Sequence, residues 1–243
     1  MNDFEQFQRR NREMIASMRQ SDVLRRVTRD WFLEASRHEY SYHFTWLGVP
    51  IIQFPQDMIA MQELIWKIRP QVIVETGIAR GGSLIFYASL LELIGRGEVL
   101  GIDVDLRPHN RQVIEAHPLS RRIGLIEGSS ISESVVAEVR RRVGDRSPVL
   151  VVLDSNHTHE HVLAELHLYA PLVSIDSYCV VMDTVIEDMP ADFVCDRPWR
   201  AGDNPKTAVH EFLKSDDRFE IDTELCAKLA ITVAPDGYLK RVR

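Results

Sequence analysis

Acidic and histidine side chains follow two apolar runs of the sequence. Asp154 and His157 come after the run 149–153, and Asp183 follows the run 177–182. Mg²⁺ is a hard cation that a few carboxylates, water and substrate oxygens satisfy, so Asp154 and Asp183 could bind it. A histidine beside such a cation has an unperturbed pKa near neutral pH and could remove a hydroxyl proton. These residue types predict metal-assisted deprotonation of a substrate hydroxyl by His157.

Other interpretations of the same residues remain open. His157 and His161 are one helical turn apart and, together with His159, could bind zinc. No cysteine or further histidine is placed to complete a zinc tetrahedron, however, and His159 and His161 fall in the first turn of a predicted helix. Asp154 could also act only as the N-cap of that helix. We therefore favour magnesium over zinc.

A run of glycines marks a second site. The apolar strand 71–75 ends in Glu75 and leads to Gly77 and to the pair 81–82. Glycine lets a ligand approach the backbone, and the N–H groups that open the next helix point outward. The spacing differs from the G-x-G-x-x-G of dinucleotide folds, and the acid before the first glycine disfavours a phosphate. The turn suits a cationic or hydroxyl-bearing ligand, unless it is an ordinary strand–helix turn capped by Ser83.

A further acid ends the next predicted strand, 98–103. In doubly wound sheets, a carboxylate at the end of the second strand commonly binds ribose hydroxyls. Asp103 and the glycine turn together suggest S-adenosylmethionine (SAM), with its ribose at Asp103 and its amino-acid part near Glu75. Ser129 could touch the adenine edge, or it could cap helix 132–142. The predicted cofactor-binding residues are Glu75, Thr76, Gly77, Gly81, Ser83, Asp103 and Ser129.

Strands and helices alternate through the middle of the chain. Strands are predicted at 71–75, 98–103, 122–127, 148–153 and 178–183, and helices at 56–69, 82–94, 109–116, 132–142 and 158–169. This alternation predicts a doubly wound, Rossmann-like α/β fold with a parallel sheet. Short strands at 219–221, 229–233 and 238–242 follow, the last two joined by the turn 234–237. A terminal antiparallel hairpin on a parallel sheet is the arrangement of class I methyltransferases.

The first part of the chain has a different character. Apolar side chains at helical spacing predict two N-terminal helices over 3–38, and the aromatic segment 42–50 looks too irregular for a regular element. We expect residues 1–55 to form a helical extension with this aromatic segment, and 56–243 to form the methyltransferase domain. Trp46 could border the substrate site, or it could only hold the extension against the core.

A third segment, from Arg197 to Val209, resembles a flexible cover over the crevice. Trp199 could stack on a sugar or planar group, and Arg200 or Lys206 could meet an anionic group. Asn204 followed by proline also fits a helix N-cap and first helical position, so part of the segment has a structural explanation.

Composition limits the function classes. The chain has 243 residues and a net charge of −7, which argues against nucleic-acid binding because that binding depends on phosphate neutralisation. Cys179, Cys195 and Cys226 fit a reducing compartment. The N-terminus lacks a secretory pattern and no apolar run is long enough to span a bilayer, so we expect a soluble, cytoplasmic protein. The N-terminal helices could serve as an assembly surface in a homo-oligomer.

The segments 46–48, 75–83, 154–157 and 235–238, in this order, resemble the cephalosporin hydroxylase and rhamnosyl O-methyltransferase family, which is related in its site to macrolide sugar O-methyltransferases. The resemblance implies a SAM-dependent O-methyltransferase, often using Mg²⁺, that acts on a small-molecule hydroxyl of a sugar, glycolipid or natural product. It also implies that Asp154 and Asp183 are metal ligands and that His157 is the general base.

One position departs from the family pattern. Metal-dependent relatives place an acid directly before the second aspartate, whereas this chain has Met182, and a thioether is a poor ligand for a hard cation. Metal affinity could be weak, Glu187 or Asp188 could substitute, or the site could work without metal. Two competing functions are a hydroxylase or other oxidoreductase of a small natural product, and a non-catalytic SAM-binding protein. The first lacks a flavin motif or a clear two-histidine-one-carboxylate iron site.

Overall fold

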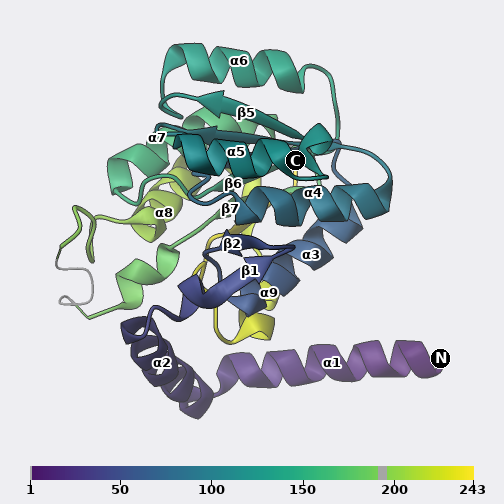
Figure 1. Ribbon diagram of the computed structural model, residues 1–243. Coiled ribbons are helices and arrows are strands. Elements are labelled where there is room, and N and C mark those ends of the chain that lie inside the picture. Colours follow the sequence, from purple (N-terminus) through teal and green to yellow (C-terminus); the bar gives the residue numbers. More distant parts are fainter. Residues whose placement is uncertain (1, 191–195) are drawn as a thin grey trace.

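The computed structural model describes residues 2–190 and 196–243, so Cys195 lies outside the described residues. A seven-stranded sheet forms its centre, in the order β5-β4-β3-β6-β7-β9-β8 (Figure 1). The strands are β3 (Val72–Thr76), β4 (Glu98–Asp103), β5 (Ile123–Glu127), β6 (Val149–Leu153), β7 (Tyr178–Val181), β8 (Phe219–Ile221) and β9 (Tyr238–Arg241). The first five are parallel, and β9 runs antiparallel between β7 and β8. The predicted Rossmann-like methyltransferase sheet is confirmed.

Helices cover both faces of this sheet. They are α3 (Pro55–Ile68), α4 (Gly82–Ile94), α5 (Pro108–Ala116), α6 (Glu133–Val143), α7 (His159–Tyr169), α8 (Pro205–Ser215) and α9 (Thr223–Leu229). Helices α3, α4, α5 and α9 pack into one hydrophobic core, and α6, α7 and α8 into the other. Strands β3 and β6 are buried along their whole length because both of their faces are covered, which explains their unbroken apolar sequences.

The C-terminal region differs from its prediction in one element. The predicted strand 229–233 is wrong: α9 ends at Leu229, and β8 pairs directly with β9 to form the antiparallel unit. The segment after α9 is held as a loop by Asp57 of α3. One carboxylate oxygen of Asp57 accepts hydrogen bonds from the hydroxyls of Thr232 and Tyr238, and the other accepts from the backbone N–H of Val233. A contact across the fold therefore overrides the local apolar pattern.

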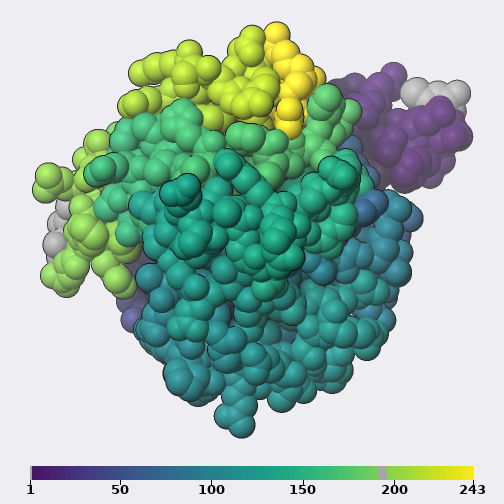
Figure 2. Space-filling view, turned by 90° about the horizontal axis from the view of Figure 1, so that it is seen from above, coloured from purple at the N-terminus to yellow at the C-terminus, as the bar shows by residue number. Residues whose placement is uncertain are grey.

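The helices α1 (Asp3–Gln20) and α2 (Asp22–Arg37) confirm the two N-terminal helices predicted over 3–38. Helix α1 lies along the outside of the sheet domain and buries none of its residues, whereas α2 buries Phe32 (Figures 1 and 2). The segment expected to be irregular instead forms a hairpin of β1 (Phe44–Trp46) and β2 (Val49–Ile51). Leu47 and Gly48 both have positive φ, as a tight two-residue hairpin turn requires. No helix among the described residues is long and apolar enough to cross a membrane.

Candidate active site

The turns after β3 and β6 touch through a glycine. A Cβ atom at Gly77 would lie 2.0 Å from the backbone oxygen of Asp154, and Gly77 has φ of +85°. The backbone N–H of Asp154 in turn donates to the carbonyl oxygen of Thr76 at 2.9 Å. The side chain of Thr76 is fully buried and lies at the same junction, where its hydroxyl oxygen is 3.4 Å from this N–H. Gly77 therefore allows the glycine turn and the predicted catalytic loop to form a single crevice.

Asp103 shapes the glycine turn. Its Oδ2 accepts hydrogen bonds from the backbone N–H groups of Ile78 at 2.8 Å and Ala79 at 3.3 Å, and its Oδ1 accepts from that of Asp105 at 3.0 Å. The side chain lies at the rim of a cavity of about 170 Å³. The lining residues include Gln53, Gly77, Ser83, Asp103, Asp154 and Ser155. The cavity unites four of the predicted site residues.

Glu75 is fully buried and contacts Ser83, which lines this cavity. The hydroxyl of Ser83 donates to its Oε2 at 2.9 Å, so Ser83 holds the carboxyl group rather than capping the helix. Its Oε1, the buried hydroxyl of Tyr87 and the side-chain amide of Gln53 lie close enough to interact with one another, although none of them makes a hydrogen bond of ordinary geometry within the described chain. Burial raises the pKa of Glu75 to about 8. Gln53 and Ser83 connect this buried polar group to the cavity that they line, and polar atoms with incomplete hydrogen bonding fit a ligand that carries both donors and acceptors, such as the amino-acid part of SAM.

Gln53 and Tyr87 were missed by the sequence reasoning. A signal for Gln53 is present, because it is a polar residue in the otherwise apolar run 51–54 just before a helix. Tyr87 carries no such signal, since an aromatic residue inside an apolar helix is usually part of the core. Only the fold shows that its hydroxyl lies near Glu75, whose negative charge, together with burial, raises the pKa of Tyr87.

Asp154, His157 and Asp183 converge at the carboxyl ends of β6 and β7. One possible ligand atom from each lies within 4.8 Å of the others, and His157 Nε2 is 3.1 Å from Asp183 Oδ2. Asp183 has φ of 57°, a left-handed conformation that is uncommon outside glycine and that turns the chain into η4 (Thr184–Asp188). Burial and the nearby charge of Asp183 raise the pKa of Asp154 well above its usual range. A cation would relieve this repulsion, and the carboxylate oxygens of Asp154 and Asp183 are donors that suit Mg²⁺.

The other histidines of this loop have partners elsewhere. His159 lies 2.8 Å from the Thr207 hydroxyl through Nδ1 and 3.2 Å from Glu211 through Nε2. His161 Nε2 is 3.1 Å from the Ser130 hydroxyl and 3.2 Å from that of Ser155. The three histidines therefore do not converge on one point, which disfavours the zinc interpretation.

The suggested substitutes for the missing acid are also engaged. Glu187 accepts hydrogen bonds from the backbone N–H of Gly202 at 2.7 Å and from the amide of Asn204. Asp188 pairs with Lys206 at 2.8 Å. Neither acid belongs to the three-residue cluster.

Glu187 thereby anchors the cover segment, defined here as residues 197–204. Trp199 of this segment stands edge-on to His157, with ring centroids 4.7 Å apart and planes at 86°. The guanidinium of Arg197 lies over Trp199, 5.5 Å from the ring centroid. Arg200 pairs through its backbone with Asp203, and its exposed side chain makes no ion pair with any described residue. The cover segment brings an aromatic face and cationic groups to the predicted base.

Two predicted residues lie apart from this centre. Trp46 donates from its indole N–H to the Ser89 hydroxyl at 3.0 Å and packs edge-on against Phe86, so its described contacts hold the hairpin to α4. Ser129 accepts the backbone N–H of Ser132 at 3.0 Å in the turn before α6, and it does not line the cavity beside Gly77.

Known proteins are similar to this chain in sequence and in fold. The sequence profile of the rhamnosyl O-methyltransferase/CmcI family matches residues 38–242. The rhamnosyl O-methyltransferase of Mycobacterium leprae is 30% identical over 203 residues, covering 81% of this chain and 82% of its own length. That of Mycobacterium bovis (strain BCG / Pasteur 1173P2) is 29% identical over 206 residues, covering 81% and 78%.

Solved structures agree with the sequence comparison at the level of the fold. A structure of CmcI with Mg and SAM has a TM-score of 0.59 at 19% identity, covering 83% of this chain and 78% of its own. A putative caffeoyl-CoA O-methyltransferase from Staphylococcus aureus has a TM-score of 0.54 at 16% identity, covering 87% and 92%. With its sequence match running through both the glycine turn and the Asp154–Asp183 cluster, the chain belongs to the rhamnosyl O-methyltransferase/CmcI family.

Proposed function

We propose that this SAM-dependent O-methyltransferase methylates a hydroxyl group of a sugar-containing small molecule, assisted by Mg²⁺, with His157 as the general base. One observation carries the proposal: Asp154 lines the cavity beside the glycine turn and also belongs to the cluster with His157 and Asp183. A cofactor in that cavity would therefore lie next to the groups that activate the acceptor. The relatives named as rhamnosyl O-methyltransferases support a sugar as the acceptor class.

The cofactor supplies an electrophilic methyl group on a sulfonium. Asp103 would bind the ribose hydroxyls with the lone pairs that its backbone contacts leave free, and the N–H groups of the glycine turn would line the cofactor's path. The carboxyl group of Glu75, whose Oε1 lacks a hydrogen bond of ordinary geometry, would bind the amino group, and Thr76 and Gly81 would contribute to the same cofactor site. Ser129 does not line the cavity, but it follows Gly128, whose backbone N–H donates to the carbonyl oxygen of Asp103 at 2.8 Å, so it would contact the adenine edge beyond the ribose.

His157 would take the acceptor proton. In the neutral tautomer that donates from Nε2 to Asp183, the Nδ1 atom carries the lone pair that accepts the proton. The hydroxyl oxygen then forms its bond to the methyl carbon as the carbon–sulfur bond breaks, and the electron pair of that bond stays on sulfur. Asp183 stabilises the imidazolium that results, because its carboxylate lies 3.1 Å away.

Asp154 and Asp183 would hold the cation. Oδ2 of Asp183 faces His157, which leaves Oδ1 for a metal, and Asp154 offers a second carboxylate within the same 4.8 Å cluster. Asp154 and Asp183 would place that cation where it could stabilise the negative charge that develops on the acceptor oxygen. Trp199 and Arg200 of the cover segment would contact the acceptor, the indole by stacking on a sugar ring.

Calorimetric titration with SAM and, in parallel, NAD⁺, with and without Mg²⁺, tests the cofactor assignment. We expect micromolar SAM binding and no NAD⁺ signal. Release of S-adenosylhomocysteine with rhamnosyl glycosides as acceptors then tests the reaction. Asp154→Asn should abolish this release, whereas Asp105→Asn, which changes an exposed acid that pairs with Arg107, should not. Absence of SAM binding would overturn the proposed function.

A further inference from the structure

Helix α7 carries a buried acid that the proposed reaction does not use. The side chain of Glu165 is fully buried, whereas its buried neighbours on the helix, Val162, Leu166 and Tyr169, are apolar or aromatic. Its Oε2 has no hydrogen-bond partner among the described residues. Burial of a carboxyl group is unfavourable unless hydrogen bonds compensate it, so the contacts of the other oxygen, Oε1, indicate what Glu165 does.

The Oε1 atom of Glu165 belongs to a network with two serines and a histidine. It accepts a hydrogen bond from the Ser155 hydroxyl at 2.7 Å. Nε2 of His161, one helical turn before Glu165, lies 3.5 Å from the same oxygen and 3.2 Å from the Ser155 hydroxyl oxygen. The hydroxyl oxygen of Ser130 is 3.1 Å from this Nε2 as well. The network therefore connects α7 with the turn after β5 and with the loop after β6.

The acid fixes the direction of the hydrogen bonds in this network. A serine hydroxyl has one proton, and Ser155 donates it to Glu165. The Ser155 oxygen can therefore only accept from His161, which requires a hydrogen on Nε2 of the imidazole. The Ser130 hydroxyl oxygen then accepts from the same N–H. Glu165 thereby makes His161 the donor that holds both serines.

The two serines lie on turns that no strand pairing joins. Ser130 follows β5 and Ser155 follows β6, and β4 and β3 lie between these two strands in the sheet. Helix α7 bridges the gap, and its Tyr169 hydroxyl also donates to the backbone carbonyl of Ser130 at 2.6 Å. Ser155 lines the cavity beside the glycine turn, and a Cβ atom at Gly77 would lie 2.8 Å from its Cα. A shift of Ser155 would therefore change the shape of the cofactor cavity.

We propose that Glu165 positions the cofactor site, through Ser155 on one side and through His161 and Ser130 on the other. Glu165 neither lines the cavity nor belongs to the proposed metal cluster, so it is a positioning residue. This role rests on the proposed function, because the cofactor whose site Glu165 orders is SAM. The affinity for SAM should therefore depend on a hydrogen bond between two side chains of the protein, one of which does not reach the cavity.

Two substitutions of Glu165 isolate this hydrogen bond. Glu165→Met and Glu165→Gln both remove the charge and nearly keep the length of the side chain, but only glutamine keeps an oxygen that accepts from Ser155. Calorimetric titration with SAM should give a Kd about 10-fold higher for Glu165→Met and within about 2-fold of the wild-type value for Glu165→Gln. Equal Kd values for the two variants would contradict the proposal.

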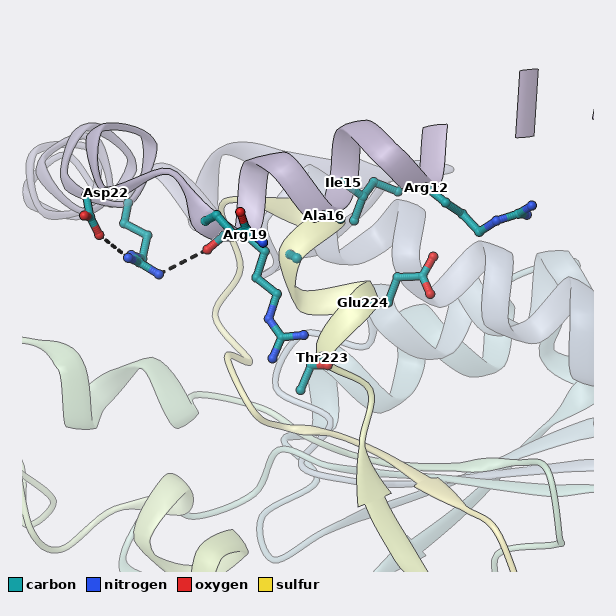
Figure 3. Close-up of a pocket in the computed structure, with 10 residues that line it drawn as sticks. Arg12, Ile15, Ala16, Arg19, Asp22, Thr223 and Glu224 are labelled. Atoms are coloured by element: carbon teal, nitrogen blue, oxygen red, sulfur yellow. Dashed lines mark hydrogen bonds and ion pairs between the residues drawn. The ribbon is translucent and has the colours of Figure 1, made fainter. Parts of the chain in front are cut away.

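Glu224→Met is the matched control for the loss of a glutamate. Glu224 lines a groove of about 740 Å³ between α9 and α1, where Figure 3 shows it on the opposite side from Arg12 and Ile15. This groove shares no lining residue with the cofactor cavity. The Kd for SAM should therefore stay at the wild-type value in Glu224→Met.

Ser155→Ala changes an exposed residue and gives a second measurement that does not disturb the core. It should raise the Kd for SAM by about 10-fold, as Glu165→Met does. The double variant Ser155→Ala/Glu165→Met should bind SAM no more weakly than either single variant, because all three lack the same contact. Additive effects of the two substitutions would contradict positioning through Ser155.

Hydrogen exchange of the ligand-free protein separates this role from the proposed function. Peptides that cover 128–132 and 154–158 should exchange faster in Glu165→Met than in Glu165→Gln or the wild type, because the two turns lose their link to α7. Unchanged exchange in a protein that binds SAM would overturn the positioning role alone. A wild type that binds no SAM would overturn the proposed function and, with it, this role.

Discussion

His157 Nε2 lies 3.1 Å from Asp183 Oδ2, and this pair joins the loop after β6 to the turn after β7. The two residues are 26 positions apart in sequence but adjacent in space, because parallel strands end at the same edge of the sheet. The contact orients the imidazole, and Trp199 packs against its ring in an edge-to-face arrangement. The geometry gives His157 a fixed position next to the cavity formed by the glycine turn.

Replacement of His157 should separate catalysis from cofactor binding. His157→Ala removes the proposed base, and loss of a general base typically lowers kcat by about 10²–10⁴-fold. The Kd for SAM should stay within a few-fold, since His157 does not line the cavity beside Gly77. Calorimetry and S-adenosylhomocysteine release provide the two measurements. His210→Ala is the matched control, because His210 pairs with Asp236 on the exposed side of α8; unchanged turnover in His157→Ala would remove that residue from the mechanism.

Metal removal should act on turnover more than on SAM binding. Treatment with a chelator is expected to abolish methyl transfer and added Mg²⁺ to restore it, since Asp154 and Asp183 both offer hard oxygen donors. The double variant Asp154→Asn/Asp183→Asn should not respond to Mg²⁺. Full activity of the wild type in the chelator contradicts the metal-assisted mechanism.

Much of the central fold could be predicted from the sequence, because strands that are buried on both faces must be apolar throughout. The runs containing β3 and β6 end in Glu75 and Asp154, and the abrupt change from apolar to acidic residues locates the edge of the sheet where ligands bind. The convergence of Asp154, His157 and Asp183 follows from the parallel topology alone.

The remaining features depend on long-range contacts. Segment 229–233 has the composition of a strand, yet Asp57, more than 170 positions earlier, binds Thr232 and Val233 and holds them as a loop. The sequence left two roles open for Trp46, at the substrate site or as an anchor of the extension, and its contact with Ser89 arises only when the hairpin packs on α4. Neither partner can be identified from the local pattern.

Replacement of Glu187, which anchors the cover segment, should weaken binding of the acceptor without changing the affinity for SAM. Glu187 binds Gly202 and Asn204 without belonging to the metal cluster, so Glu187→Ala should loosen the segment that carries Trp199. We expect the KM for the acceptor to rise by about 10-fold, because Trp199 and Arg200 would no longer be held where they contact the acceptor. The affinity for SAM should stay unchanged. Asp188→Ala, which removes the neighbouring contact to Lys206, is the control. An equal rise of KM in both variants would argue against a specific role for Glu187.

Gly77 should tolerate no side chain, for a reason distinct from its backbone angle. Gly77 and Gly95 have nearly the same φ, +85° and +86°, but a Cβ at Gly77 would lie 2.0 Å from Asp154 O, whereas nothing lies within 4 Å at Gly95. Gly95→Ala should cost about 1 kcal/mol of unfolding free energy from the left-handed conformation alone. Gly77→Ala should cost several times more and weaken SAM binding, because the turns after β3 and β6 must separate. Denaturant unfolding of the two variants measures the difference, and equal costs would contradict the close contact.

Glu75 should make the stability of the ligand-free protein depend on pH. Burial raises its pKa in the folded protein to about 8, above the ordinary value of 4.5, because burial disfavours the charged form. Between these two values the folded state holds a proton that the unfolded state has lost. The stabilisation is fully present below about pH 4.5, is lost as pH rises, and reaches its minimum above about pH 8.

Glu75→Gln keeps an acceptor for the Ser83 hydroxyl and removes this titration. The unfolding free energy of the variant relative to wild type should therefore increase by up to about 1.4 kcal/mol for each pH unit between 5 and 8, and level off above this range. Denaturant titrations at several pH values measure the difference. Glu224→Gln changes an exposed glutamate and should show no such trend. A pH-independent difference between Glu75→Gln and wild type would mean that Glu75 is ionised in the folded protein, paired with a cation or ordered water that satisfies Oε1.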